Sequence, residues 1–212
     1  MALTTSLRKA DVAAVATPLL IVAVPQGGLP PSLAALDAAA GGALARLYAT
    51  RDFTGKKDQV ASVYPAGPAA RILLVGAGDA ASVRTVRRAA SVAGKRARLG
   101  GVKEAVYCLT PEARGAVPEA DAVQATAEGL AYGAWHFDAL KQPPEEVKPA
   151  LERVEILAHG AAAEAGHTLG AAIGAAQALT RGLQVLPGNT CTPSFLAAQA
   201  KELAARHSFD IT

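Results

Sequence analysis

The chain has 212 residues, of which 51% are hydrophobic, 18% are charged and only 4% are aromatic. This much apolar material excludes an intrinsically disordered protein, and the length excludes a miniprotein held together by disulfides. The net charge of +3 is too small to indicate nucleic-acid binding by itself. Two cysteines without C-x-x-C spacing predict neither a zinc cluster nor a disulfide framework, so a reducing, cytoplasmic location is expected.

The N-terminal residues permit two interpretations. Arg8 and Lys9, followed by the apolar residues 12–24, imitate a secretory signal. Asp11 and Pro18 interrupt that pattern, so two short strands on either side of Pro18 are the preferred interpretation. No apolar run reaches the length of about 18 residues that a membrane-spanning helix requires.

Short apolar runs alternate with longer alanine-rich runs of helical periodicity, which is typical of an α/β domain. The predicted strands cover residues 11–15, 19–24, 59–64, 71–75, 102–109 and 153–158. Several of them are apolar throughout, which predicts a central sheet with helices on both faces. The predicted helices cover residues 32–40, 43–50, 82–99, 120–132, 161–179 and 194–206, and a proline-rich loop covers residues 142–146.

A glycine-rich turn after the fourth predicted strand is one candidate binding site. Gly76 and Gly78 belong to a G-x-G-x-x-A sequence between a strand and a helix, an arrangement that can hold a pyrophosphate on backbone N–H groups. Asp79 would place a negative charge at that position, and no acidic residue ends a strand about 20 residues further on, as ribose binding requires. A tight strand-to-helix turn explains the same residues.

The helix predicted for residues 82–99 has a basic outer face. Arg84, Arg87 and Arg88, followed by three more basic side chains, lie away from its apolar stripe. Such a face can contact the phosphates of a nucleic acid. A solvated helix surface explains it equally well, and no aromatic residue is interleaved to stack on bases.

Metal or nucleophilic chemistry has little support in the sequence. The four histidines form no H-x-x-H or H-E-x-x-H pair. Cys108 lies in a predicted apolar strand and is expected to be an inert core thiol, whereas Cys191 precedes a helix that Pro193 begins. No catalytic or metal-binding residue is assigned.

Three stretches resemble one known family. Residues 53–57 (FTGKK), 127–138 (AEGLAYGAWHFD) and 180–193 (TRGLQVLPGNTCTP) resemble segments of the leucyl aminopeptidases, the M17 metallopeptidase family, in the same order and spacing. The resemblance implies a three-layer α/β/α, macro-domain-like mixed sheet over residues 1–160. It also implies a long connecting helix over 161–186 and the truncated start of a catalytic domain over 187–212.

The resemblance implies a function for the family as a whole. Its members are cytosolic metalloexopeptidases, commonly hexamers, that release N-terminal amino acids from peptides with two divalent metals, Mn or Zn. The metal-binding motifs have no counterpart here, so the chain alone is expected to be the inactive N-terminal portion. The alternative is a stand-alone macro-like module that binds nucleic acid or a nucleotide such as ADP-ribose.

Two features suggest surfaces that a further domain would cover. Gly166, Gly170 and Gly174 recur every four residues along one helix, and residues 208–212 look like a strand without a successor. We expect this glycine strip and this terminal strand to be exposed, and the isolated chain either to self-associate or to be disordered at its end.

Overall fold

The computed structural model describes residues 3–142 and 148–211. The chain divides into two compact units, Met1–Ala178 and Leu179–Thr212. Most of the loop predicted for residues 142–146 lies outside the described residues. None of the helices in the described ranges combines the length and the hydrophobicity of a membrane-spanning segment.

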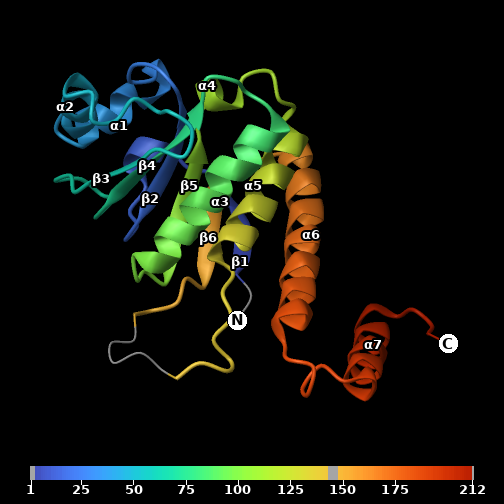
Figure 1. The fold of residues 1–212 in the computed structure, drawn as a ribbon. Helices are drawn as coiled ribbons and strands as arrows, with labels where there is room; N and C mark the ends of the chain where they lie inside the picture. Colours follow the sequence, from blue (N-terminus) through green and yellow to red (C-terminus); the bar gives the residue numbers. More distant parts are fainter. Residues whose placement is uncertain (1–2, 143–147, 212) are drawn as a thin grey trace. The chain divides into compact units, whose positions relative to one another are not determined.

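The first unit contains one six-stranded sheet, shown in Figure 1. Its strands are β1 (Thr4–Arg8), β2 (Leu20–Pro25), β3 (Val60–Val63), β4 (Ile72–Gly78), β5 (Glu104–Leu109) and β6 (Arg153–Leu157). The strand order is β1-β6-β5-β2-β4-β3, and every pair is parallel except β3 with β4. The predicted mixed sheet is therefore confirmed.

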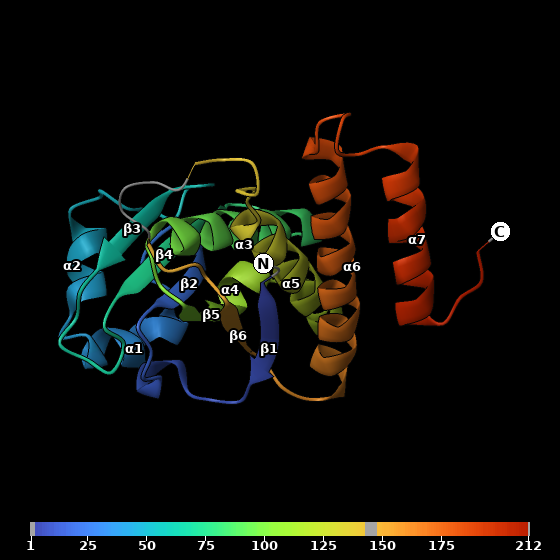
Figure 2. The ribbon, with the colours of Figure 1, turned by 90° about the horizontal axis from the view of Figure 1, so that it is seen from below.

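Helices cover both faces of this sheet, as Figure 2 shows. The helices of the chain are α1 (Ala34–Ala39), α2 (Ala43–Ala49), α3 (Val83–Leu99), α4 (Pro111–Arg114), α5 (Glu119–Ala134), α6 (Ala161–Val185) and α7 (Pro193–His207). On one face, α3 and α5 pack along each other over a core that includes Ile21, Val75 and Leu130. On the other face, α1 and α2 cover a second core around Val22 and Leu74. The three-layer α/β/α arrangement is confirmed.

Local signals explain where the clearest helix begins and ends. The side chain of Ser82 accepts a hydrogen bond from the Thr85 N–H, and the Thr85 side chain accepts one from the Ser82 N–H. This capping box satisfies donors that the first turn of α3 leaves without intrahelical partners. Gly100 ends the helix at the position the sequence indicates.

The prediction of a strand over residues 11–15 is wrong. Asp11 caps a 3-10 turn, Val12–Ala14, by accepting a hydrogen bond of 3.0 Å from the Ala13 N–H. A short acidic side chain that bonds its own backbone favours a turn over a strand. The N-terminal strand is instead β1, a half-polar edge strand that pairs with β6 from the far end of the domain.

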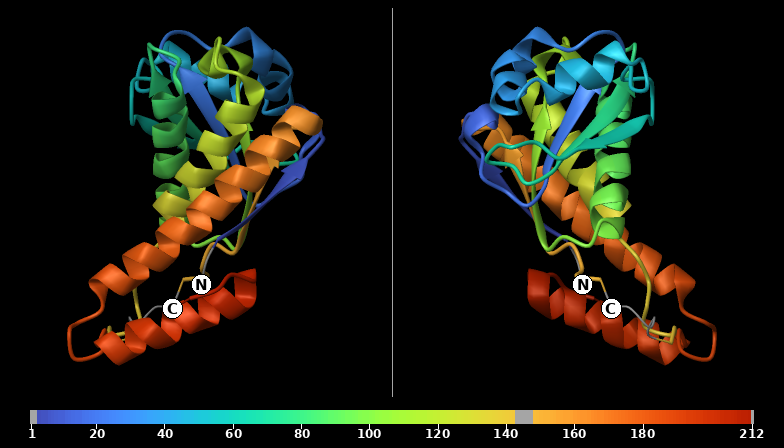
Figure 3. Two further views of the ribbon diagram at one scale, coloured as in Figure 1. Left: turned by 90° about the vertical axis from the view of Figure 1, so that its right-hand side faces the viewer. Right: turned by 90° about the vertical axis from the view of Figure 1, so that its left-hand side faces the viewer.

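The part of α6 that belongs to the first unit, residues 161–178, lies along α5, as Figures 1 and 3 show from different sides. A Cβ atom added at Gly166 would lie 2.1 Å from the backbone oxygen of Ala120. A Cβ at Gly170 would lie 2.5 Å from the oxygen of Gln124. The expectation that the glycine strip is exposed is therefore wrong, because α5 of the same domain occupies it.

The second unit contains the end of α6 and all of α7. The Thr192 hydroxyl accepts a hydrogen bond of 3.2 Å from the Phe195 N–H, and Pro193 is the first helical residue, as predicted. Ser208 ends α7 in the left-handed conformation, with φ of 55°. Residues 209–211 form no strand, so the expected terminal strand is wrong over the part that the structure describes.

Candidate functional site

The glycine turn lies at the carboxyl end of β4, where open α/β sheets commonly bind ligands. The Gly76 N–H donates to the backbone oxygen of Gln59 at 2.8 Å, and the Gly78 N–H donates to that of Gly55 at 3.1 Å. A Cβ at Gly76 would lie 2.0 Å from the oxygen of Lys56. These two glycines therefore hold a neighbouring loop, and their N–H groups already have acceptors.

That loop, residues 53–59, carries the FTGKK sequence. Phe53 is fully buried, and its ring meets that of Tyr48 edge-on with centroids 5.5 Å apart. The Gln59 side chain accepts hydrogen bonds from the Thr54 and Lys56 N–H groups at 3.0 and 3.2 Å. Gly55 has φ of +69° and packs directly on the backbone of β2. We call this segment the 53–59 loop; its own side chains fix its conformation against the strand ends.

A carboxylate also lies on the side of the sheet where the parallel strands have their carboxyl ends. Glu112, in α4, accepts hydrogen bonds from the Ser32 hydroxyl at 2.6 Å and from the Ser32 N–H at 3.0 Å. This contact joins the segment after β2 to the segment after β5. Because the Glu112 carboxylate is negatively charged, it disfavours the binding of a phosphate at this position.

Two of the three arginines predicted to contact phosphate have partners inside the protein. The Arg87 Nε donates to Glu128 of α5 at 2.6 Å, and the Glu128 side chain is only 5% exposed. Arg88 forms a two-point contact with Asp58 of the 53–59 loop, at 2.6 and 2.5 Å. These hydrogen bonds from Arg88 lower the pKa of Asp58 and raise that of Arg88. Within the described ranges, Arg84 forms neither a hydrogen bond nor an ion pair.

The histidines and cysteines are dispersed. His136 lies 2.7 Å from Asp138, and His167 shares a hydrogen bond of 3.0 Å with Thr5. Among residues 3–142 and 148–211, no three His, Cys, Asp or Glu side chains lie close enough together to hold a metal ion. Burial raises the pKa of Cys108 to about 12, so this thiol is protonated at neutral pH and is not a nucleophile.

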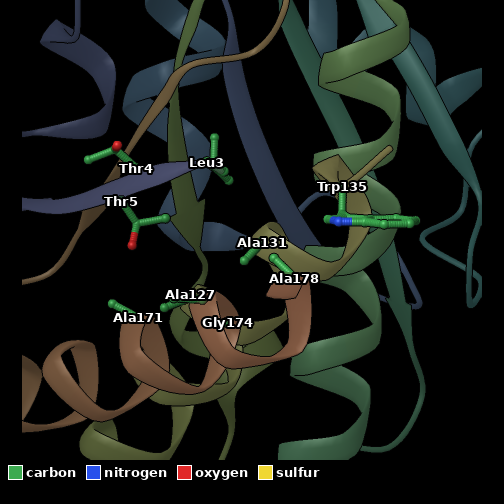
Figure 4. Close-up of a pocket in the computed structure, with 10 residues that line it drawn as sticks. Leu3, Thr4, Thr5, Ala127, Ala131, Trp135, Ala171, Gly174 and Ala178 are labelled. Atoms are coloured by element: carbon green, nitrogen blue, oxygen red, sulfur yellow. The ribbon is translucent and has the colours of Figure 1, made fainter. Parts of the chain in front are cut away.

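A cavity of about 240 Å³ lies between β1, α5 and α6, and the sequence analysis did not predict it. Figure 4 shows Trp135 and Leu3 beside the small side chains Ala127, Ala131 and Ala178. Its polar side-chain groups are the hydroxyls of two threonines on β1 and the indole N–H of Trp135. Such a surface has no acid, base or nucleophile with which to carry out chemistry.

Comparison with known proteins decides the family. Residues 21–144 match the model of the cytosol aminopeptidase family, N-terminal domain. The chain belongs to this family. A probable cytosol aminopeptidase from Geobacter sp. (strain M21) is 33% identical over 92% of this chain and 40% of its own length. A second one, from Alkalilimnicola ehrlichii, is 34% identical over 91% of this chain and 40% of its own length.

Several solved structures have the same fold as this chain. A tomato leucine aminopeptidase mutant has a TM-score of 0.82, with 24% identity, over 97% of this chain and 43% of its own. The bottromycin maturation enzyme BotP, in complex with Mn, has a TM-score of 0.71 and 26% identity over 91% of this chain and 37% of its own. A Trypanosoma brucei macrodomain in complex with ADP has a TM-score of 0.59 at 14% identity, over 78% and 68%. The macro-domain-like fold is thereby confirmed.

The aminopeptidase-like sequence stretches correspond mainly to internal packing. The 53–59 loop contains the first stretch, and α5 contains most of the second, including the buried Glu128. A Cβ at Gly133, also in that stretch, would lie 1.9 Å from the backbone oxygen of Ser91 in α3. The family signature in this chain therefore describes how the domain is assembled.

Proposed function

We propose that this chain is the N-terminal, non-catalytic portion of a leucyl-aminopeptidase-like metalloexopeptidase that releases N-terminal amino acids from peptides. The observation that carries the proposal is the family match over residues 21–144, together with relatives of which the chain spans 40%. We assign residues 1–160 to the macro-domain-like domain, 161–186 to a connecting helix and 187–212 to the start of the catalytic domain. The resemblance of residues 180–193 to the family's domain junction supports these boundaries.

The part of this chain in such an enzyme is to anchor the connecting helix. At Gly166 and Gly170 the backbone of α6 directly contacts that of α5, and at Gly174 it packs on the side chain of Ala131. In turn, α5 is tied to α3 by Gly129 and Gly133, whose added Cβ atoms would lie 2.3 and 1.9 Å from backbone oxygens. A helix that is held by such close contacts has little freedom to rotate or slide, because the densely packed neighbouring helix would have to move with it. Such a helix can hold an attached domain at a defined angle.

The two divalent metals of the family, Mn or Zn, find no fitting site among the described residues. When bound, such metals supply an activated water and polarise the substrate carbonyl. We propose that their ligands belong to the portion of the relatives' length that this chain does not span. We further propose that the protein is cytoplasmic and that it assembles into a homo-oligomer. By resemblance to the family, this oligomer is a hexamer.

An activity assay tests the proposal directly. The purified 212-residue chain is incubated with leucine p-nitroanilide and Mn²⁺, beside the Geobacter relative as the positive control. We expect release of p-nitroaniline by the relative only. Hydrolysis by this chain that depends on Mn²⁺ would contradict the non-catalytic assignment.

A second candidate function is binding of a polyanion, DNA or a nucleotide such as ADP-ribose, through Gly76, Gly78, Arg84, Arg87 and Arg88. The likeness to a macrodomain and the free cationic side chain of Arg84 favour it. The geometry makes Arg84 the decisive residue, because changing Arg87 would leave the buried carboxylate of Glu128 without its cation. A DNA duplex that shifts at low salt, and no longer does so with Arg84→Ala, would support DNA binding; no shift at low salt would exclude it. ADP-ribose is tested separately by calorimetric titration of the chain, and no heat of binding would exclude the nucleotide.

A further inference from the structure

A cavity of about 270 Å³ lies between the edge strand β3 and the C-terminal turn of α3. Figure 1 shows β3 at the outer edge of the sheet, on the opposite edge from β1. The apolar side chains of Leu19, Leu73 and Leu99 line this cavity, and Ser62 of β3 contributes a hydroxyl. Leu19 and Leu73 are buried, whereas Leu99 is 48% exposed. The cavity therefore has an apolar floor that opens to solvent.

Two arginines line the same cavity, and in the part of the chain that the structure describes neither has an acidic partner. Arg71 precedes β4, and Arg96 lies in the last turn of α3. Within the described residues, neither guanidinium forms a hydrogen bond or an ion pair, and no acidic side chain lines the cavity. Arg87, earlier on α3, differs because Glu128 pairs with it. Two uncompensated cations beside an apolar surface fit a ligand that is both anionic and apolar.

The strand at this cavity adds a third element of recognition. β3 pairs only with β4, so in the part of the chain that the structure describes its other edge has no strand beside it. An extended peptide can pair with such an edge through its main chain and place side chains in adjacent pockets. The cavity is slightly below the range of roughly 300–1,000 Å³ typical of small-ligand clefts, so it suits one side chain of a longer ligand.

We propose that this groove binds the C-terminal end of an extended peptide. The peptide main chain lies along β3, its last apolar side chain enters the cavity above Leu19 and Leu73, and its carboxylate contacts Arg71 and Arg96. A free carboxylate is planar and accepts paired hydrogen bonds, which matches what a guanidinium donates. No aromatic side chain lines the cavity for stacking on a nucleobase, which favours a peptide over a nucleotide.

The two arginines are not equivalent as tests. A Cβ added at Gly100 would lie 2.9 Å from an Nη atom of Arg71, so this guanidinium rests against the end of α3. A cation at a helix C-terminus also stabilises the helix, so Arg71→Met would change folding as well as binding. Arg96 also lies in the last turn of α3, but its side chain is exposed and is not among the atoms packed against Gly100, which makes Arg96→Met the more informative variant.

The experiment uses the 212-residue chain and a fluorescein-labelled hexapeptide that ends in valine and leucine with a free carboxylate. Its affinity is measured by fluorescence anisotropy beside that of the same peptide with a C-terminal amide. We expect the amide to bind about tenfold more weakly, since the charge-assisted hydrogen bonds are lost. Arg96→Met should weaken binding of the acid by a similar factor of about ten and leave binding of the amide unchanged.

Lys95→Met is the matched control, because Lys95 is exposed on the same helix, carries the same charge and does not line the cavity. We expect it to change the affinity less than about twofold. Equal binding of acid and amide, or no binding of the acid, would overturn the proposal without reference to any variant. An equal loss in Lys95→Met and Arg96→Met would also overturn it, as would N-acetylleucine binding as tightly as the hexapeptide.

Discussion

The helix layer of α3, α5 and α6 and the 53–59 loop at the strand ends both depend on glycine, but for different contacts. In the helix layer, Gly166 and its repeats let two helix backbones meet. At the strand ends, Gly76 lets a loop backbone cross a buried strand, and Gly55 also supplies a positive φ of +69°. In both regions, glycine spacing predicts that another backbone approaches closely. Only the tertiary structure shows whether the approaching group is a segment of the same chain.

Two neighbouring arginines of α3 form ion pairs, one in each of these two regions. Arg87 joins α3 to α5 inside the helix layer, where its partner Glu128 is buried. Arg88, the next residue, joins α3 to Asp58 of the 53–59 loop, and both side chains remain partly exposed. Neighbouring arginines on one helix therefore differ in what they stabilise.

The largest effect is expected from Gly76→Ala at the strand ends. The new methyl group would lie 2.0 Å from the Lys56 oxygen and 2.6 Å from the backbone of Gly55, within a fully buried strand. We expect a loss of about 3 kcal/mol in the free energy of unfolding, the upper range for overpacking. Urea denaturation measures it, with Gly28→Ala as control because nothing lies within 4 Å of an added Cβ there. Equal midpoints for the two variants would contradict the packing assigned to Gly76.

In the helix layer, Gly166→Ala is expected to have the next largest effect. Its Cβ would lie 2.1 Å from the Ala120 oxygen, which forces α5 and α6 apart. Alanine is a better helix former by about 1 kcal/mol, so the net loss is about 2 kcal/mol. Gly182→Ala in the same helix meets nothing within 4 Å and should not destabilise the chain. A Gly166→Ala protein as stable as the parent in urea would show that the two helices are not in backbone contact.

The arginine pair gives a smaller effect that separates the two regions. Arg87→Met leaves the Glu128 carboxylate buried without its cation, and we expect a loss of about 1–2 kcal/mol, reduced because Arg87 itself is 41% exposed. Arg88→Met removes an exposed pair and should shift the urea midpoint less. A larger shift for Arg88→Met than for Arg87→Met would reverse this ranking of the two contacts.

The smallest effect is a pH dependence from the 53–59 loop. Hydrogen bonds from Arg88 hold the pKa of Asp58 below its ordinary value of 3.8, so the contact stabilises the folded state above that pH. This stabilisation is lost as the pH falls below 3.8 through the lower, folded-state pKa. Asp58→Asn suits the comparison, because asparagine tolerates the φ of 65° at this position.

Urea midpoints of the parent and of Asp58→Asn should therefore differ near pH 6, and the difference should shrink as the pH falls below 3.8. A difference that stays constant across this range would mean that the Asp58 charge contributes nothing through Arg88.

Much of the fold could be predicted because its signals are local. The runs that form β2 and β4 are apolar throughout, the run that forms β5 is apolar after its first residue, and α3 has both a periodic stripe and a cap. Local signals failed where pairing is between distant segments. β1 is half polar and becomes a strand only because β6, from the far end of the domain, lies beside it. The short helix α4 was also missed, since four residues are too few for a periodic pattern.

The candidate sites show the same division. The sequence placed Gly76 and Gly78 in a turn after a strand that ends at residue 75, whereas both are residues of β4 itself. It also did not show that the 53–59 loop accepts their N–H groups. It placed Arg84, Arg87 and Arg88 on one basic helix, without showing that two of them have acidic partners. The cavity lined by Arg71 and Arg96 joins residues from three elements, so no linear pattern reveals it.

By itself, the sequence determined the α/β class, the limits of most elements and the family, because hydrophobic period, caps and motif order are properties of consecutive residues. The tertiary structure decided which glycines meet which backbone, which arginines are neutralised and which remain free. Those outcomes depend on distances between segments far apart in the chain. An arginine that pairs with a buried carboxylate and an arginine that lines an apolar cavity are the same residue type in the sequence, and only the folded structure distinguishes them.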